Sequence, residues 1–284
     1  MIVGNRDRGI AWFSGIVFAF LILVYGGPVV YFIIKTIQPK ESTLAAVLQD
    51  AGFYRAVGAS IAFASLSTLL QAIVALLLAL ILSERIHGTQ WLSGIIVSPF
   101  FVPTIVIVLA WQFLSDPQIG LLTKLVGGTG ELAASFRGRE SAFTIMVITA
   151  VYEGFPFVFL LLLGRLSQVD PLLYHLADLN KLSYWNRFTS ISWPAVREIF
   201  LSLLCLRFVV AFLKFEIPWI VYAHKEQFAP TDTVAVYLFR VAFLQWNTGK
   251  AYAASLLLLL LAGIVTMVVW LMYSFLKKEN EKYA

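Results

Sequence analysis

Four long apolar runs without a single Asp, Glu, Lys or Arg constrain this chain more than any other feature. They cover residues 11–34, 56–83, 88–115 and 251–276. The hydrocarbon core of a bilayer is about 30 Å thick, and an α-helix needs about 20 apolar residues to cross it. Charged residues make up only 13% of the chain, against about 25% in an ordinary soluble domain. The four runs therefore predict helices that cross a membrane.

Two further runs are nearly as apolar. Residues 141–164 contain one charged residue, Glu153, and residues 199–221 contain three. All six runs are too long for the strands of a membrane barrel, which need about 10 residues each. We therefore predict an all-α membrane protein with six transmembrane helices, in a single transmembrane domain that covers residues 1–284.

The ends of the chain indicate its orientation in the membrane. Lys and Arg in short loops favour the cytoplasmic side, but the loops as a whole are nearly balanced. Two arginines within residues 6–8 and three lysines within residues 277–282 nevertheless flank the outermost runs. We therefore expect both termini in the cytoplasm. That orientation places residues 174–194 inside, and residues 115–140 and 223–250 outside.

The sequence argues against several kinds of site. The net charge of +5 comes from basic residues that are scattered and flank the apolar runs, so we expect lipid headgroups and no nucleic acid as partner. The one cysteine, Cys205, lies within an apolar run and indicates no disulfide framework. The histidines lie far apart, with no second ligand at helical spacing, so we expect no metal site. They are His87, His175 and His224.

The sequence shows no phosphate-binding loop. Residues 247–251, NTGKA, end like such a loop, but the required Gly upstream and the Ser or Thr after the lysine are missing. Any ATP chemistry must therefore belong to another chain. We expect a chain that is not an enzyme and holds no cofactor of its own.

A polar segment interrupts the apolar pattern at residues 170–194. Asp170 is a good helix N-cap and Pro171 suits a first turn. Leucines that share one helix face follow at positions i, i+4 and i+7, namely Leu172, Leu176 and Leu179. Ser183 is suited to cap a second turn, which Pro194 should end. The segment thus predicts a helix, an elbow and a helix, which either lie on the inner leaflet or dock a soluble partner.

This spacing resembles the cytoplasmic signature of the permease subunits of binding-protein-dependent ABC importers, which carry a MetI-like transmembrane domain. The signature is Glu-Ala-Ala, three residues, Gly and a later Pro. His175, Leu176 and Ala177 stand at its first three positions, Lys181 stands at the Gly, and Pro194 stands at the Pro. The form found here is degenerate.

Three other stretches resemble the carbohydrate-uptake branch of this family. Residues 98–125 are similar to its third span and following loop, with paired prolines, a Trp and Gly-Leu-Leu. Residues 154–174 are similar to its approach to the signature, and residues 237–261 to its last loop and span. The resemblance covers roughly residues 53–276 in the right order.

The resemblance implies a role in ATP-driven uptake. The chain would pair with a second permease subunit to form the pathway for a sugar or related polar solute through the cytoplasmic (inner) membrane of a bacterium or archaeon. ATP-binding cassette subunits would bind ATP and Mg and receive the cytoplasmic helix in a cleft. An extracytoplasmic solute-binding protein would deliver the solute. The implied cleft contacts are Leu172, Leu176 and Ala177, and the implied rim is His175, Asp178, Asn180 and Lys181.

Two of these residues depart from the signature. A lysine does not adopt a positive φ as cheaply as a glycine, so Lys181 predicts either a different elbow geometry or an altered face on the ATPase, such as an acidic rim. His175 in place of Glu would lose or reverse a charged contact.

Charged side chains within the apolar runs indicate the solute pathway. Each costs at least about 2.5 kcal/mol at the bilayer centre, so Glu153, Arg207, Lys214 and Glu216 should face a cavity or each other. Pairing or snorkelling is the simpler interpretation for the last two, which leaves Glu153 and Arg207 as pathway candidates. Aromatic candidates for contact with a sugar are Trp111, Tyr152, Phe155, Phe208 and Phe212.

Backbone groups are a further candidate feature of the pathway. We expect Gly154 and Pro156 to break the fourth helix and free carbonyl groups toward a cavity.

Three alternatives stay open. A transporter or channel driven by an ion gradient would show related halves with broken helices at matching positions, and the sequence shows no such repeat. A membrane scaffold without transport would explain the degenerate signature. Within the importer family, the solute could instead be a polyamine or a phosphate ester.

Overall fold

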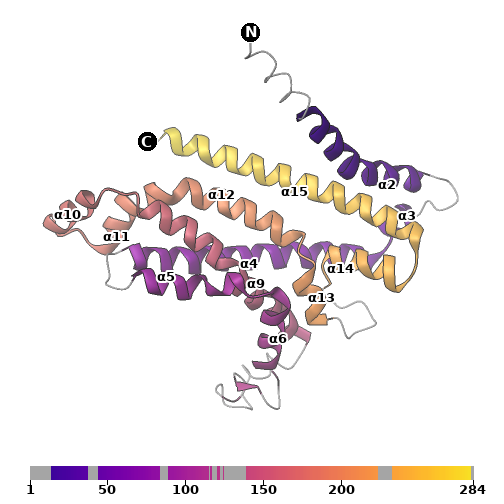
Figure 1. Ribbon diagram of the computed structural model, residues 1–284, viewed down its shortest axis with the longest axis horizontal. Coiled ribbons are helices and arrows are strands. Elements are labelled where there is room, and N and C mark those ends of the chain that lie inside the picture. The colour runs from indigo at the N-terminus through magenta and orange to yellow at the C-terminus, as the bar shows by residue number, and fades with distance from the viewer. Residues whose placement is uncertain are drawn as a thin grey trace, which may run out of the picture. The chain divides into compact units, whose positions relative to one another are not determined.

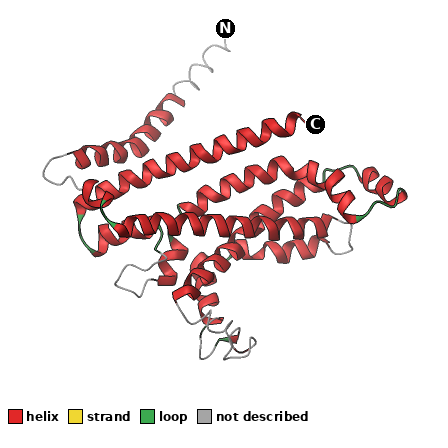
Figure 2. Cartoon of the chain, turned by 180° about the vertical axis from the view of Figure 1, so that it is seen from behind, coloured by secondary structure: helices red, strands yellow, loops and turns green. Residues whose placement is uncertain are grey.

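The computed structural model describes residues 14–37, 44–83, 89–114, 116, 120–121, 124, 139–222 and 232–282. Within these ranges the regular structure is helical, and no strand occurs (Figure 2). The all-α prediction is therefore confirmed for the described part of the chain. The expectations for the basic N-terminal residues, for His87 and His224, for most of the predicted outer loop 115–140 and for residues 223–231 of the other outer loop fall outside these ranges.

The chain divides into two units, which we describe separately. The first comprises Met1–Phe53 and Leu238–Leu261, and the second comprises Tyr54–Tyr237 and Ala262–Ala284. The single domain expected over residues 1–284 stays a prediction.

An ion pair and a ring contact join the two sequence stretches of the first unit. Its elements are η1 (Ile22–Gly26), α2 (Gly27–Ile37), α3 (Leu44–Leu48), η4 (Arg240–Leu244) and the first part of α15 (Thr248–Lys282). Lys250 Nζ lies 2.6 Å from Asp50 Oδ2, and the rings of Tyr31 and Tyr252 meet edge to face with centroids 6.0 Å apart. The Asp50 carboxylate also accepts the N–H of Gly52 at 2.7 Å. This bond holds the first turn of the next helix.

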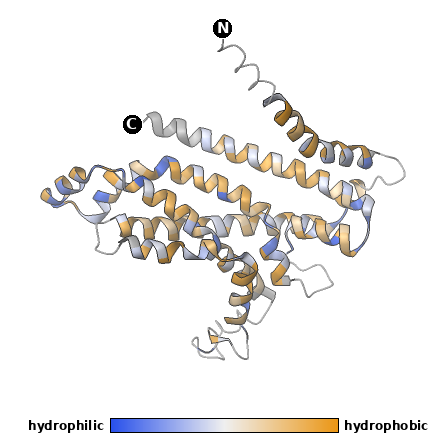
Figure 3. Ribbon diagram, in the orientation of Figure 1, coloured by the Kyte–Doolittle hydropathy of each residue, from blue (hydrophilic) through white to orange (hydrophobic). Residues whose placement is uncertain are grey.

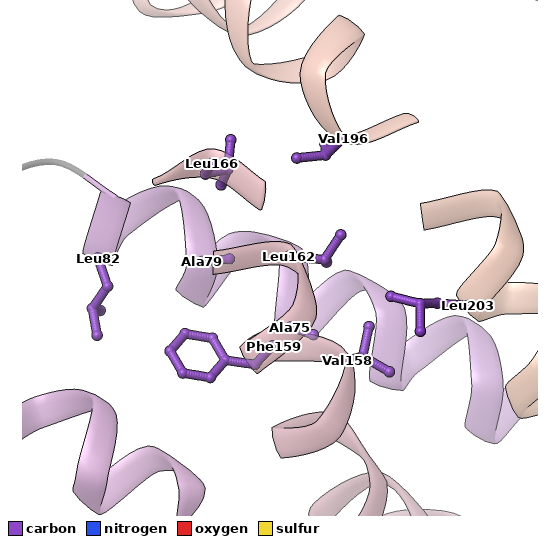
Figure 4. Close-up of a cluster of buried hydrophobic side chains, with 9 residues drawn as sticks. All are labelled: Ala75, Ala79, Leu82, Val158, Phe159, Leu162, Leu166, Val196 and Leu203. Carbon is purple, nitrogen blue, oxygen red and sulfur yellow. The ribbon is translucent and has the colours of Figure 1, made fainter. Parts of the chain in front are cut away.

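Three long helices run side by side in the second unit (Figure 1). They are α4 (Ala51–Ser83), α9 (Arg139–Leu166) and α12 (Trp193–Phe212). Side chains from all three converge on α9 (Figure 4). We call this group the Phe159 cluster, and its members are Ala75, Ala79, Leu82, Val158, Phe159, Leu162, Leu166, Val196 and Leu203. The small residues Ala75 and Ala79 are fully buried, which allows the helices to approach closely.

A second apolar cluster lies around the N-terminal half of α9. There α6 (Thr104–Leu114) and α13 (Glu216–Tyr222) pack against α9 and against each other. We call this group the Met146 cluster, and its buried members are Phe63, Val108, Met146, Val147, Ala150 and Ile217. The two clusters occupy different levels along α9, and the candidate site lies between them.

The prediction of one straight span at residues 88–115 is wrong. The run folds as α5 (Thr89–Val97), η2 (Ser98–Phe101) and α6, and the two halves are bent by 97°. Pro103 explains the break, because a proline disfavours helical backbone at the residue before it. Val102 is accordingly extended, with φ −89° and ψ 130°.

The predictions for the fourth and fifth runs, a break in the fourth and a single helix in the fifth, also need correction. Residues 199–221 are interrupted, because α12 ends at Phe212 and α13 begins at Glu216. The fourth run, expected to break at Gly154 and Pro156, instead forms the continuous helix α9 with Pro156 inside it. Neighbouring helices stabilise a proline within a membrane helix, and here Pro156 is buried between them.

The helices are long and apolar enough for a multi-pass membrane protein. Four helices of the described residues meet this test, and a fifth span results if the bent pair is counted as one. The four are Ser14–Lys35, Ala51–Ser83, Ala142–Leu166 and Thr248–Ser274. Apolar residues dominate along the long helices of each unit (Figure 3).

Candidate functional site

An ion pair connects α9 with the segment that follows α12. Lys214 Nζ lies 2.7 Å from Glu153 Oε1, and each side chain is 23% exposed. Thr104 Oγ1, at the start of α6, donates to the same carboxylate oxygen at 3.2 Å. The negative charge of Glu153 is therefore compensated within the chain. Pairing, one of the two simpler interpretations given above for Lys214, is confirmed.

A second polar contact joins α4, α9 and α12. Arg207 Nε donates to Gln71 Oε1 at 2.8 Å, and Gln71 Nε2 donates to the Ala150 carbonyl at 2.9 Å. Gln71 is only 1% exposed, so its amide is held in one orientation by these two bonds. We call Gln71, Thr104, Glu153, Arg207 and Lys214 the polar layer.

Gly154 makes the contact between Arg207 and Gln71 sterically possible. A Cβ at this position would overlap the Arg207 guanidinium and lie 2.5 Å from Gln71 Oε1. The helix needs a residue without a side chain here because two polar groups pack directly on its backbone.

Replacing Gly154 with alanine should therefore disrupt the polar layer while leaving α9 helical. The new methyl group displaces the ends of Arg207 and Gln71, which costs a charge-assisted hydrogen bond, or about 1.5–3 kcal/mol. Thermal unfolding of the detergent-solubilised protein measures the loss. Gly164→Ala in the same helix is the control, because a Cβ there meets no atom within 4 Å. Equal melting temperatures for the two variants would contradict the prediction.

The polar layer lies between the two apolar clusters on every helix that contributes to both. On α9, Met146 lies on one side of Glu153 and Phe159 on the other. On α4, Gln71 lies between Phe63 and Ala75. Ionisable groups flanked on both sides by membrane-spanning apolar structure are costly, and they mark functional sites by default.

Some of the predicted pathway residues lie close together in the structure, and others are buried in the apolar core. Glu153 and Arg207 both belong to the polar layer, where each bonds another residue. The rings of Trp111 and Tyr152 meet edge to face, with centroids 6.0 Å apart. Phe155 packs against the Phe159 cluster. The last two aromatic candidates are Phe208 and Phe212. Phe212 is 1% exposed, and Phe208 is half-buried.

Two members of the polar layer are not among the residues predicted from the sequence. Gln71 and Thr104 carry no charge and lie in runs that look uniformly apolar. The usable signal was Gln71, the only amide side chain in the 33 residues of α4. A buried amide in such a helix requires a polar partner.

The second candidate region is the elbow segment, residues 170–194. Its first helix, α10 (Pro171–Leu179), begins as predicted, because the Asp170 side chain accepts the N–H of Leu172 at 2.9 Å. Lys181 then adopts φ 52°, and the N–H of Leu182 donates to the Ala177 carbonyl at 3.0 Å. Lys181 thus takes the positive φ that a glycine adopts readily, so a different elbow geometry gains no support, and an altered face on the ATPase stays a prediction.

The second half of the elbow segment continues into the long helix. Ser183 caps α11 (Tyr184–Arg187) by accepting the N–H of Asn186 at 3.3 Å, as predicted. Pro194 does not end this helix, contrary to expectation. The π-helical turn η3 (Phe188–Ser192) precedes it and leads into α12. This wider turn accommodates the missing N–H of the proline, and the helix is unbroken from Tyr184 to Phe212.

Two contacts brace the elbow segment. Arg187 forms an ion pair with Asp178, and its guanidinium also lies 5.8 Å from the centre of the Tyr184 ring. Tyr174 and Ser192 share a hydrogen bond of 3.2 Å between their hydroxyl groups. These contacts hold α10 to α11 and to the start of α12.

The elbow segment projects at one end of the second unit, beyond the ends of α9 and α12 (Figure 1). Among the predicted docking residues, Ala177 is 3% exposed, so its side chain packs against this chain. The other six are exposed, and they are Leu172, His175, Leu176, Asp178, Asn180 and Lys181.

The chain is similar in sequence to known transport proteins. It is 23% identical over 234 residues to the inner membrane ABC transporter permease protein YcjO of Escherichia coli (strain K12), a match that covers 80% of this chain and 77% of that relative. It is 31% identical over 175 residues to the trehalose/maltose transport system permease protein MalF of Thermococcus litoralis, covering 61% of this chain and 59% of that relative. No protein-family model matches the chain.

The fold is also found in a solved structure. The chain matches a subunit in the crystal structure of a bacterial alginate ABC transporter in complex with an alginate pentasaccharide-bound periplasmic protein, with a TM-score of 0.80 and 19% sequence identity. The match covers 93% of each chain. At this identity the likeness establishes the fold alone.

Proposed function

We propose, from the premise that the chain belongs to the permease subunits of binding-protein-dependent ABC importers, that it forms one half of the pathway for a sugar or related polar solute. It crosses the cytoplasmic (inner) membrane six times, with both termini in the cytoplasm. The bent pair α5–α6 is its third span and the interrupted pair α12–α13 is its fifth. It is a transport subunit and not an enzyme.

The observation that carries this proposal is the exposed and braced elbow segment. Leu172 and Leu176 on α10 are 57% and 45% exposed, although the Arg187–Asp178 ion pair and the Tyr174–Ser192 hydrogen bond connect the helix to the residues that follow it. A rigid helix with outward leucines suits insertion into a cleft of a soluble partner. The elbow segment is thus a coupling segment on the cytoplasmic side, and ATP-binding cassette subunits dock there. ATP and Mg bind in those subunits.

The helix geometry gives a route from the coupling segment to the polar layer. The unbroken helix that starts at Tyr184 carries Arg207, and 23 residues of helix span about 35 Å. When the ATPase subunits close, a rigid-body displacement of the elbow segment moves this helix. Because Arg207 bonds Gln71 on another helix, the displacement changes the polar layer directly.

The polar layer supplies the groups that a polar solute requires on its way across the bilayer. Trp111 and Tyr152 offer aromatic edges near the level of Glu153, and the charged groups supply hydrogen bonds. The named relatives include a permease of a trehalose/maltose system, which supports a saccharide as solute. A polyamine or a phosphate ester is the alternative within the family.

A complete importer needs further subunits. The chain pairs with a second permease subunit, and an extracytoplasmic solute-binding protein delivers the solute. The solved alginate transporter is a complex with a periplasmic protein, which supports this assembly. Affinity purification from the native membrane tests it. Co-purification of an ATPase and a second permease is the expected result, and recovery of the chain without either would contradict the proposal.

Replacing Lys181 with glycine should weaken co-purification of the ATPase. Glycine adopts the observed φ of 52° without strain, so the variant keeps the elbow geometry and removes only the charged side chain. If the lysine contacts an acidic rim, the complex loses one ion pair and is recovered in lower yield. Lys181→Arg is the control and should assemble normally. Unchanged assembly of the glycine variant would show that the ATPase face is not adapted to the lysine.

The ion-gradient alternative gains no support from the observed helix breaks. That hypothesis requires breaks at matching positions of two related halves. The breaks lie in the third and fifth of the six predicted runs, at Val102 and at residues 213–215, which are not matching positions.

A further inference from the structure

We propose that the Arg207 guanidinium binds an oxyanion of the solute, so that the pathway accepts acidic saccharides. This inference rests on the proposed function and specifies its substrate class. It follows from the charge balance of the polar layer and from the single hydrogen bond of Arg207 within the described part of the chain.

The polar layer contains one more cation than anion. Lys214 and Arg207 are positive, and Glu153 is the only carboxylate among the five residues. Glu153 lies 2.7 Å from Lys214 and also accepts the Thr104 hydroxyl. Its contact is therefore with Lys214. Glu153 also attracts Arg207 electrostatically, but one carboxylate balances only one of the two cations, so the polar layer keeps a net charge of +1.

The contacts of Arg207 confirm this imbalance within the described part of the chain. Its guanidinium forms one hydrogen bond, from Nε to the neutral amide oxygen of Gln71. Among the described residues, no carboxylate lies within 4.0 Å of it, and the two Nη groups have no acceptor. A positive charge at membrane depth is costly when it is unpaired, so a ligand that supplies the anion is favoured.

The surroundings of Arg207 fix the direction in which it donates. The Gln71 amide is itself held by the Ala150 carbonyl, so it anchors the Nε edge of the guanidinium. Gly154 leaves room for the Nη2 group beside the α9 backbone. The two Nη groups have no acceptor among the described residues, and their spacing matches the two oxygens of a carboxylate. Arg207 is half-buried.

Equilibrium binding tests the proposal directly. The solubilised transporter complex, without its solute-binding protein, is titrated with oligouronates such as trigalacturonate and trimannuronate. Each acid is compared with its own neutral methyl ester, and a sugar phosphate with its parent sugar. The acidic form should bind at least about tenfold more tightly, as expected for a hydrogen bond to a charged group. The pair that shows this preference identifies a carboxylate or a phosphate as the oxyanion.

Three variants assign the preference to Arg207. Arg207→Gln should remove the preference for the acid, and Arg207→Lys should retain part of it, which serves as the readout if the glutamine variant does not assemble. Arg165→Gln is the control, because Arg165 lies at the end of α9 and bonds Ala195 and Gln168. Equal binding of acid and ester by the unaltered complex would overturn this inference and leave the proposed function intact. Failure to bind any saccharide, acidic or neutral, would overturn both.

Discussion

Replacing Glu153 with glutamine alone is expected to lower the free energy of unfolding by about 3 kcal/mol. The variant leaves Lys214 charged between apolar clusters with no carboxylate at 2.7 Å. Removal of one member of a buried ion pair is costly because the other charge stays desolvated. The side chains are 23% exposed, which places the effect at the lower end of the range for buried pairs.

A double-mutant cycle separates the ion pair from its members. Lys214→Met should be comparably destabilising, and the double variant Glu153→Gln/Lys214→Met should recover most of the loss because no charge is left unpaired. Glu198→Gln is the matched control, since Glu198 is exposed on α12. Thermal unfolding of the solubilised proteins measures all four. A double variant that loses the sum of both single effects would contradict the assignment of this pair.

Replacing Leu176 with aspartate is expected to abolish stable association with the ATPase subunit. Leu176 is 45% exposed on α10, so the permease itself should fold normally. A carboxylate forced into an apolar cleft loses its hydration without gaining a partner, which should weaken docking by at least about 100-fold. Pull-down of the co-expressed ATPase measures the effect. Leu176→Met is the control and should dock as well as the natural residue.

An aspartate variant that still binds the ATPase would place the docking surface elsewhere. Unfolding temperatures that match between the aspartate and methionine variants would show that any loss of binding arises at the surface and not from misfolding.

Local features of the fold could be predicted from the sequence. Asp170 and Ser183 cap helices as expected, because an N-cap depends on the residue and its immediate neighbours. The apolar runs predicted the long helices, because the length and composition of a run are also properties of the local sequence. Prolines were harder to interpret. Pro103 breaks a run, Pro156 lies inside a continuous helix, and Pro194 follows a π-helical turn. Packing around each proline decides the outcome, and a single sequence does not contain that information.

The contacts of the polar layer could not be predicted. Arg207 and Gln71 are separated by 136 residues, and Lys214 and Glu153 by 61. The charged residues were identified because charge is conspicuous in an apolar run, but their pairing depends on how the helices pack. Lys181 is a local feature that the sequence did not settle. A lysine is disfavoured at a positive φ, but Lys181 adopts φ 52° nonetheless.

We propose that this chain provides a pathway but no energy source, so that movement must reach it through the coupling segment. Solute uptake into proteoliposomes tests the claim most directly, with the chain alone, with an imposed ion gradient, and with its partner subunits plus ATP. The account predicts accumulation only in the complete complex with ATP, and loss of that accumulation in the Leu176→Asp variant. Accumulation by the chain alone under an ion gradient would contradict it.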